Sequence, residues 1–334
     1  MKRPYYIMRS GRLSRKQNTL FFTYESEGKE PSRKIIPIED VESIYVFGEL
    51  DLNTKLINYL SQKNIPVHFF NYYGYYSSTL YPRDYLVSGF AVVDQARNYL
   101  DPLLRLELAR KFVEGAAFNI LKNLRYYNKR QRELEDLIAQ IEKTLTAAER
   151  VSTVPELMAV EGHIRVLYYS GWMKILDETY EFRKRTRQPP DNIVNALISF
   201  SNMLVYTTSL GEIYHTQLHP AISFLHEPGE RRFSLSLDMA EIFKPILADR
   251  MIFKLLNQKM LQKKHFVKEA NYCYLNEEGK KILLREYDER LKTTIKHRTL
   301  GRNVSYRHLI RLECYKLVKH ITGIEPYKPF KIWW

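Results

Sequence analysis

The hydrophobic pattern of the chain changes its period near residue 95, and this change restricts the fold more than any other feature. Before it, short apolar and β-branched runs between turn residues predict strands. After it, apolar residues recur every three to four positions, which predicts amphipathic helices. The first such stripe consists of Leu103, Leu106, Ala109, Val113, Ala117, Ile120 and Leu124. We therefore predict an α+β protein with a β domain over residues 1–86 and an all-α domain over residues 87–334.

The expected N-terminal domain is a small β-sandwich with one helix. Its predicted strands are Asn18–Tyr24, Lys34–Ile38, Ser43–Phe47, Ile65–Phe70 and Tyr75–Leu80. A helix from Thr54 to Gln62, capped by Asn53, interrupts them. A chain of 334 residues with 45% hydrophobic content can form a core in each of two domains.

The charge balance indicates a polyanionic partner. The formal net charge is +14, which favours nucleic acid, with an anionic membrane surface as the alternative. No apolar run approaches the roughly 18 residues that a membrane-spanning helix needs, so we expect no integral membrane protein. The two cysteines are far apart and lack zinc-site spacing, which indicates the reducing cytoplasm.

One stretch, from His226 to Pro245, carries a concentration of metal-binding residue types. Asp238, Glu241 and Lys244 are spaced by three, so a helix would place them on one face. If the turn at Pro228 and Gly229 folds His226 back over that face, the mixture of oxygen and nitrogen ligands suits Mg²⁺ or Mn²⁺. The alternative is a helix N-terminal capping box, with Asp238 as the cap and Glu241 reaching back to it.

A third acidic residue, Glu161, borders the buried face of the helix predicted to start after Thr153. A carboxylate at such a position is costly unless it is paired or bound to a metal. The alternative to a ligand is an ion pair with Arg165, four residues further along. Gly162 costs about 1 kcal/mol relative to alanine in mid-helix, which suggests that another backbone comes close.

Two further clusters have both a functional and a structural interpretation. Arg183, Lys184, Arg185 and Arg187 follow this helix and could contact DNA phosphates, although such a run can also be a solvated surface. His215 and His219 have a spacing that could hold a metal. The glutamate of the zinc-protease pattern is missing, because Thr216 stands there.

Taken together, these stretches resemble the CRISPR-associated integrase family, the first of the CRISPR-associated proteins. The resemblance covers nearly the whole chain and is most specific in the order Glu-Gly, then His, then Asp-x-x-Glu. The matching segments are Tyr5–Tyr6, Gly11–Leu13, Asn18–Leu20, Ile36–Pro37, Phe47–Gly48, Met158–Gly162, Arg187–Pro190 with Asn195, Phe224–His226 and Leu235–Pro245.

The resemblance implies a site for Mg²⁺ or Mn²⁺ with Glu161, His226 and Glu241 as ligands, and Asp238 and Lys244 as supporting acid and base. Many members have Asp where this chain has Glu241. It also implies a DNA integrase with endonuclease activity, which inserts spacer DNA into a CRISPR array by transesterification from a 3′-hydroxyl. The implied partners are double-stranded DNA, a second copy of the chain and the small second CRISPR-associated protein. The rivals are a non-catalytic basic DNA-binding protein and a metallohydrolase built on His215 and His219.

Overall fold

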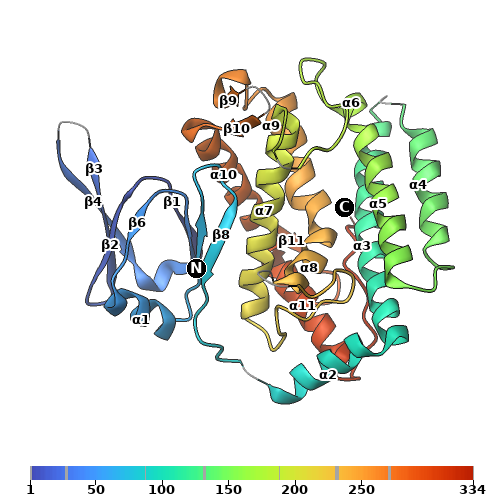
Figure 1. Ribbon diagram of the computed structural model, residues 1–334, viewed down its shortest axis with the longest axis horizontal. Coiled ribbons are helices and arrows are strands. Elements are labelled where there is room, and N and C mark those ends of the chain that lie inside the picture. Colours follow the sequence, from blue (N-terminus) through green and yellow to red (C-terminus); the bar gives the residue numbers. More distant parts are fainter. Residues whose placement is uncertain are drawn as a thin grey trace. The chain divides into compact units, whose positions relative to one another are not determined.

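The computed structural model divides the chain into two compact units, residues 1–85 and residues 86–334 (Figure 1). It describes residues 2–26, 29–86, 88–130, 133–187, 189–229, 233–269 and 272–333. In the sequence, the boundary between the two units falls one residue before the predicted one. The fold class is α+β, with strands dominating the first unit and helices the second.

Unit 1 consists of two four-stranded sheets and helix α1 (Thr54–Gln62). One sheet has the order β1-β5-β7-β8, in which β1 and β7 both run parallel to β5 and β8 returns antiparallel to β7. The other has the order β4-β3-β2-β6, with antiparallel pairs except for β6, which is parallel to β2. The strands are β1 (Arg3–Ile7), β2 (Gly11–Lys16), β3 (Thr19–Ser26), β4 (Lys29–Pro37), β5 (Val41–Val46), β6 (Leu50–Asp51), β7 (Val67–Phe70) and β8 (Tyr76–Leu80).

Both sheets of unit 1 contribute to a single hydrophobic core. Ile7 from the first sheet, Leu20 from the second and Leu60 from α1 are buried in it together. Such a shared core is the main stabilising contribution in a small unit, at about 25 cal/mol for each Å² of apolar surface removed from water. Pro4 lies in β1, at the edge of its sheet, where its missing N–H interrupts no ladder between two neighbours.

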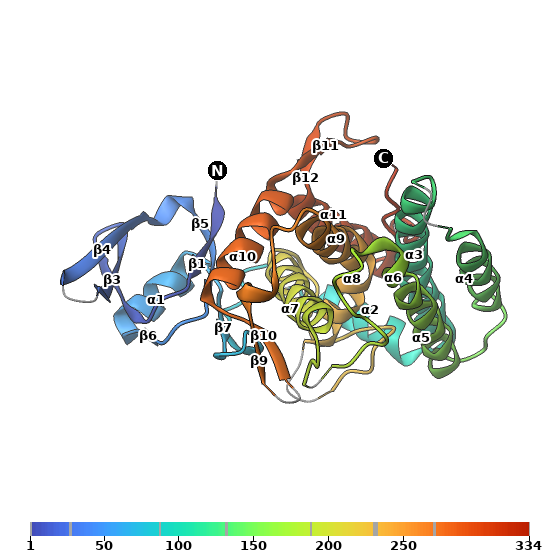
Figure 2. The ribbon, with the colours of Figure 1, turned by 90° about the horizontal axis from the view of Figure 1, so that it is seen from above.

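Unit 2 is built from packed helices. α7 packs against α8 and α11, α8 against α3, and α3 against α5. Figure 2 shows this sequence of layers, with α10 and α7 on one side of α8 and α3, α5 and α4 on the other. The helices are α2 (Gly89–Leu100), α3 (Pro102–Asn128), α4 (Glu135–Ala147), α5 (Val154–Ser170), α6 (Trp172–Ile175), α7 (Ile193–Tyr214), α8 (Ser234–Lys244), α9 (Arg250–Asn257), α10 (Glu277–Lys292) and α11 (Tyr306–Ile321).

The prediction that the second domain is all-α was wrong. Unit 2 contains two antiparallel hairpins, β9 (Phe266–Glu269) with β10 (Tyr272–Leu275), and β11 (Thr294–Lys296) with β12 (Asn303–Ser305). Their strands have only three or four residues, too few for a period of two to stand out in the sequence. About half of the residues in these strands are β-branched or aromatic, the types that strands prefer.

Two helical details also differ from the predictions. Leu103, the first residue of the predicted apolar stripe, is 79% exposed, whereas the stripe from Leu106 onward is buried. Helix α5 ends at Ser170 and does not continue to the basic segment. Gly171 follows it, and a Cβ at that position would lie 2.5 Å from Leu137 Cδ2. A side chain at position 171 would therefore have to displace Leu137, because α4 packs closely against this end of α5.

Helix α7 contradicts the expectation that no apolar run is long enough to span a membrane. It meets the length and hydropathy of a membrane-spanning segment, but 78% of its apolar window is buried within the unit. Its buried residues run along its whole length, from Val194 to Tyr214. This pattern is that of a core helix surrounded by other helices.

Candidate metal and DNA site

The acidic segment of the sequence forms helix α8, but not in the capping arrangement. α8 begins at Ser234 with Phe233 at its N-cap, so Asp238 lies inside the helix. The capping-box alternative for Asp238 and Glu241 is therefore wrong. The hydroxyl of Ser234 donates to the carbonyl of Ala221 at 2.8 Å, which ties the start of α8 to the loop that carries His226.

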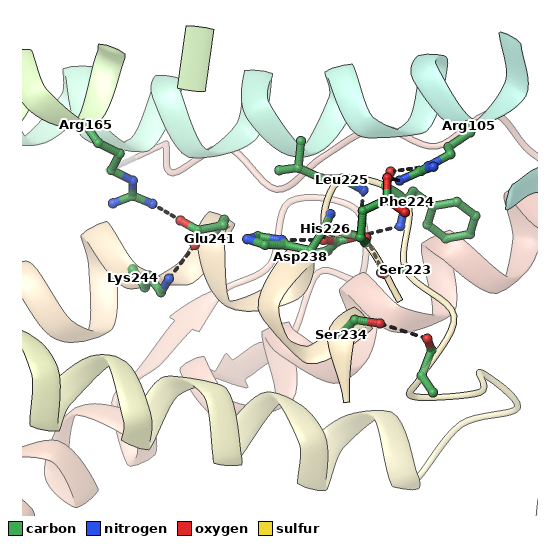
Figure 3. Close-up of polar contacts among 12 residues, drawn as sticks. Arg105, Arg165, Ser223, Phe224, Leu225, His226, Ser234, Asp238, Glu241 and Lys244 are labelled. Carbon is green, nitrogen blue, oxygen red and sulfur yellow. Dashed lines mark hydrogen bonds and ion pairs between the residues drawn. The ribbon is translucent and has the colours of Figure 1, made fainter. Parts of the chain in front are cut away.

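Asp238 fastens that loop onto α8 (Figure 3). Its side chain has no exposed surface. Oδ2 accepts hydrogen bonds from the backbone N–H groups of Phe224 at 2.7 Å and Leu225 at 3.0 Å. Oδ1 accepts from the backbone N–H of His226 at 3.0 Å and lies 2.8 Å from Nδ1 of the same residue. The predicted fold-back of His226 over the face of α8 is thus present, and a buried carboxylate holds it.

The bond to Asp238 also decides which ring nitrogen of His226 is free. With Nδ1 turned to the carboxylate, Nε2 is the nitrogen that remains for a ligand. Figure 3 shows the imidazole between Asp238 and Glu241. Burial alone would lower the pKa of His226, but the hydrogen bond and charge of Asp238 raise it above the usual value, and Glu241 adds to this effect.

A chain of charges joins α5 to α8. Arg165 Nε donates to Glu161 Oε1 at 2.9 Å, which confirms the ion pair considered from the sequence. Nη2 of the same guanidinium donates to Oε2 of Glu241. Lys244 bonds to the remaining oxygen of Glu241. Burial would raise the pKa of Glu241, yet Arg165, Lys244 and His226 hold it far below its usual value.

The metal site stays a prediction. The structure brings Glu161 and Glu241 to one guanidinium and places His226 beside Glu241, so the donor types suit Mg²⁺ or Mn²⁺. Across residues 2–333, apart from the few positions not described, no three acidic, histidine or cysteine side chains lie close enough to hold an ion. Arg165 stands between the two glutamates, and its positive charge takes the place that a cation would need.

The structure does not support two other expectations for this region, a close backbone at Gly162 and a metal site at His215 and His219. Gly162 was expected to admit a neighbouring backbone, but among the described residues nothing lies within 4 Å of a Cβ built there. His219 Nδ1 accepts a hydrogen bond from the N–H of Ala221 at 3.3 Å, so this nitrogen is already used. His215 ends helix α7 as its C-cap. The described side chains thus give no support to a metal clip of His215 and His219.

Comparison with known proteins decides the family. A family model described as "CRISPR associated protein Cas1" matches residues 5–289. A relative from Thermodesulfovibrio yellowstonii, named CRISPR-associated endonuclease Cas1 3, is 52% identical over 99% of this chain and 100% of its own. The chain belongs to the Cas1 family. The resemblance found in the sequence is thereby confirmed.

Solved structures agree with this assignment. A CAS1 protein from Thermotoga maritima has a TM-score of 0.85 and 42% identity over 96% of this chain and 97% of its own. Two more distant structures share the fold of this Cas1-family chain. One is a casposase bound to integration product, with a TM-score of 0.84, 21% identity and coverage of 99% and 93%. The other is a Cas6-RT-Cas1–Cas2 complex, with a TM-score of 0.85 and 15% identity over 100% of this chain and 36% of that chain.

Close to the charged cluster of this Cas1-family protein lies a carboxyl group, Asp249, that was not expected from the sequence. Helix α8 ends at Lys244, and the following Pro245 lacks the N–H that would continue its hydrogen bonding. Residues Pro245–Asp249 form a π-helical turn. Asn123 on α3 donates to the carbonyl of Pro245 at 2.8 Å. The turn places Asp249 in the interior, with Oδ2 lacking a hydrogen-bond partner in the described structure. Burial raises the pKa of Asp249 to about 7, although Arg165 acts against it.

This carboxyl should make stability depend on pH. The folded protein keeps a proton on Asp249 up to about pH 7, whereas the unfolded chain releases it near pH 4. Stability is therefore lost as the pH rises from 4 to 7, by at most about 4 kcal/mol. We expect Asp249→Asn to unfold at a higher temperature than wild type at pH 8 and at nearly the same temperature at pH 4. Thermal melts of both proteins across this range test the effect, and parallel pH curves would contradict it.

The four cations proposed to contact phosphate divide into two groups. Arg183, Lys184 and Arg187 are exposed. Arg185 instead points into the unit, where its guanidinium donates to Asn195 Oδ1 at 3.2 Å and to Ser199 Oγ at 2.9 Å on α7. In this Cas1-family structure Arg185 therefore anchors the basic segment, and the other three are available to an anionic ligand.

Proposed function

We propose that this Cas1-family protein is a divalent-metal-dependent DNA integrase and endonuclease that inserts spacer DNA into a CRISPR array. The observation that carries the proposal is the alignment of Asp238, His226 and Glu241, in which a buried carboxylate orients an imidazole toward a second carboxylate. A carboxylate behind a histidine is the usual support of a metal-binding imidazole. Relatives over the full length are named endonucleases, and the casposase neighbour was solved with an integration product.

Glu161, His226 and Glu241 would hold the ion, Mg²⁺ or Mn²⁺. When bound, it would supply a Lewis acid that polarises the phosphoryl group and stabilises the oxygens that attack and leave. For this to occur, Arg165 has to release at least one glutamate. The freed guanidinium and the ammonium of Lys244, both mostly buried and charged, then face the negative charge of the phosphodiester.

The reaction we propose is a direct transesterification. The 3′-hydroxyl of the spacer precursor attacks a phosphodiester of the repeat, one P–O bond forms and one breaks, and the leaving strand takes the proton as a new 3′-hydroxyl. This route needs no covalent intermediate with the protein. It is therefore consistent with the described site, which is not built around a nucleophilic side chain activated by a general base. Water in place of the 3′-hydroxyl gives the endonuclease activity.

The proposed partners follow from charge and from the neighbours. A net charge of +14 suits double-stranded DNA, both spacer precursor and repeat. The Cas1–Cas2 complex among the structural neighbours supports Cas2 as a partner. We further propose that unit 1, the β domain, forms the homodimer and docks Cas2, and that the protein acts in the cytoplasm.

The test is joining of a short DNA duplex into supercoiled plasmid. We expect joined product with Mn²⁺ or Mg²⁺, none with EDTA, and affinity for DNA that falls steeply with salt. A protein that binds DNA but never joins it, even with Cas2 present, would be the non-catalytic DNA-binding rival. His215→Ala serves as the control for the second rival, and we expect it to join DNA at the wild-type rate. Loss of joining in this variant would favour the site at His215 and His219.

A further inference from the structure

Gly162 occupies a position in α5 where the fold of the described chain gives no reason for glycine. It lies eight residues from each end of the helix, where glycine is the least favourable residue other than proline. Its φ angle is not positive, and apart from its chain neighbours and the adjacent backbone of α5, no described atom lies within 4 Å of a Cβ built on it. By contrast, a Cβ at Gly115 would lie 2.8 Å from Pro329 Cβ. Packing therefore explains the glycine at position 115 but not the one at position 162.

The open space lies at the edge of the charged cluster. Gly162 precedes Arg165 by three residues and is its neighbour on the surface of α5, whereas Glu161 projects about 100° further round the helix. The side chains one turn before and after it, Met158 and Val166, are 38% and 66% exposed. We call Met158, Gly162 and Val166 the bare flank of α5. The bare flank has no charged side chain and no bulk at its centre.

The surroundings of the bare flank favour an anionic occupant. Arg165 lies one turn away, and Lys244 joins the same cluster from α8. Tyr169, also on this side of α5, has a pKa of about 12 because of burial, and the positive charges of Arg165 and Arg185 act against that rise. Arg185, which anchors the basic segment to α7, is thus close enough to influence Tyr169 on α5. The cluster next to the bare flank thus contains two cations, Arg165 and Lys244, which could turn to an anionic ligand.

We propose that the sugar-phosphate backbone of the bound DNA strand passes over α5 at Gly162, and that glycine is kept there to let the strand reach Glu161 and Arg165. Bare backbone is what a chain offers where a ligand must approach closely. The inference rests on the proposed function and adds a residue that positions the DNA without taking part in the chemistry. If the proposal is right, a side chain introduced at position 162 will fit the folded protein but will weaken DNA binding.

Two substitutions of increasing size test this idea. Gly162→Ala and Gly162→Leu should both fold, and the alanine variant should melt about 2–4 °C above wild type because helix propensity improves and the space is open. Mn²⁺ binding by calorimetry should not change. Affinity for a DNA duplex, measured by fluorescence anisotropy, should fall at least about tenfold for Ala and further for Leu, and joining should lose efficiency mainly through KM.

The matched control adds bulk at another small exposed residue of the same helix. Ala159 lies three positions before Gly162, further round α5 from Glu161, and Ala159→Leu should bind and join DNA like wild type. Wild-type affinity in both Gly162 variants would overturn the proposal, as would a fall in melting temperature for Gly162→Ala. Dissociation of a wild-type dimer in Gly162→Leu would assign the bare flank to a second copy and would also overturn it.

The proposed function and this inference can fail separately. If wild type binds DNA without joining it under any condition, the integrase mechanism is wrong. The graded loss of duplex binding across Gly162→Ala and Gly162→Leu would still establish the strand's path over α5. If wild type joins DNA and both variants do so equally well, the mechanism stands and the role of Gly162 is refuted.

Discussion

Replacing His226 with alanine is expected to reduce DNA joining on the order of 10³-fold and to abolish Mn²⁺ binding, while the protein remains folded. The loss lies at the upper end of the roughly 10²–10³-fold cost of removing one transition-state donor, because a ligand holds the whole charge-stabilising centre in place. The structural cost is small by comparison. His226 is 22% exposed in its side chain and makes one side-chain bond, to Asp238, worth about 1 kcal/mol.

Calorimetric titration with Mn²⁺ and the plasmid-joining assay measure the two effects of His226→Ala, and a thermal melt confirms folding. His215→Ala is the matched control, since it removes an imidazole at the end of α7 that lies outside the charged cluster. If His226→Ala still binds Mn²⁺ and joins DNA at the wild-type rate, the imidazole is structural. The alignment of Asp238, His226 and Glu241 would then have another purpose.

Helical spacing explains how much of this site was visible in the sequence. Asp238, Glu241 and Lys244 were expected on one face of a helix, and α8 carries all three. Spacing by four likewise revealed the pair of Glu161 and Arg165. Both are local patterns, set by a period that any α-helix imposes.

The contacts that the sequence did not reveal are those between distant segments. Arg165 meets Glu241 across 76 residues, and only the packing of α5 and α8 against α3 brings them together. The buried position of Asp249 could not be predicted from the sequence for a different reason. The π-helical turn after Pro245 inserts one extra residue into the helical period, so extrapolation from α8 places Asp249 on the wrong side.

The strand order of unit 1 shows the same limit. The segments of β5 and β7 were recognised as strands, but their parallel pairing, and that of β1 with β5, crosses long connections. The sequence of a short strand shows which of its faces is buried, but it does not show which other strand it pairs with. The recognised family supplied what the local patterns could not, since the ligand set Glu161, His226 and Glu241 came from the resemblance.

Replacing Asp238 with alanine is expected to destabilise unit 2 by on the order of 5 kcal/mol and to remove joining activity with it. A carboxylate only accepts hydrogen bonds, so one side chain serves the backbone N–H groups of Phe224, Leu225 and His226. Alanine leaves these three donors without their acceptor at about 1–3 kcal/mol for each buried group. A loss of this size is comparable with the whole stability of many domains.

Asp238→Asn separates the two roles of this residue. The amide keeps the shape and one acceptor oxygen, but its NH₂ group faces N–H donors, so we expect a smaller loss of stability, about 2 kcal/mol. Joining should still fall about as far as in His226→Ala, because the imidazole loses the carboxylate that orients it. Glu227→Gln, a charge change at an exposed residue of the same loop, should alter stability by less than about 1 kcal/mol. Urea unfolding measures all three. If Asp238→Asn joins DNA at the wild-type rate, the carboxylate does not orient His226 for catalysis, and its purpose is to hold the loop.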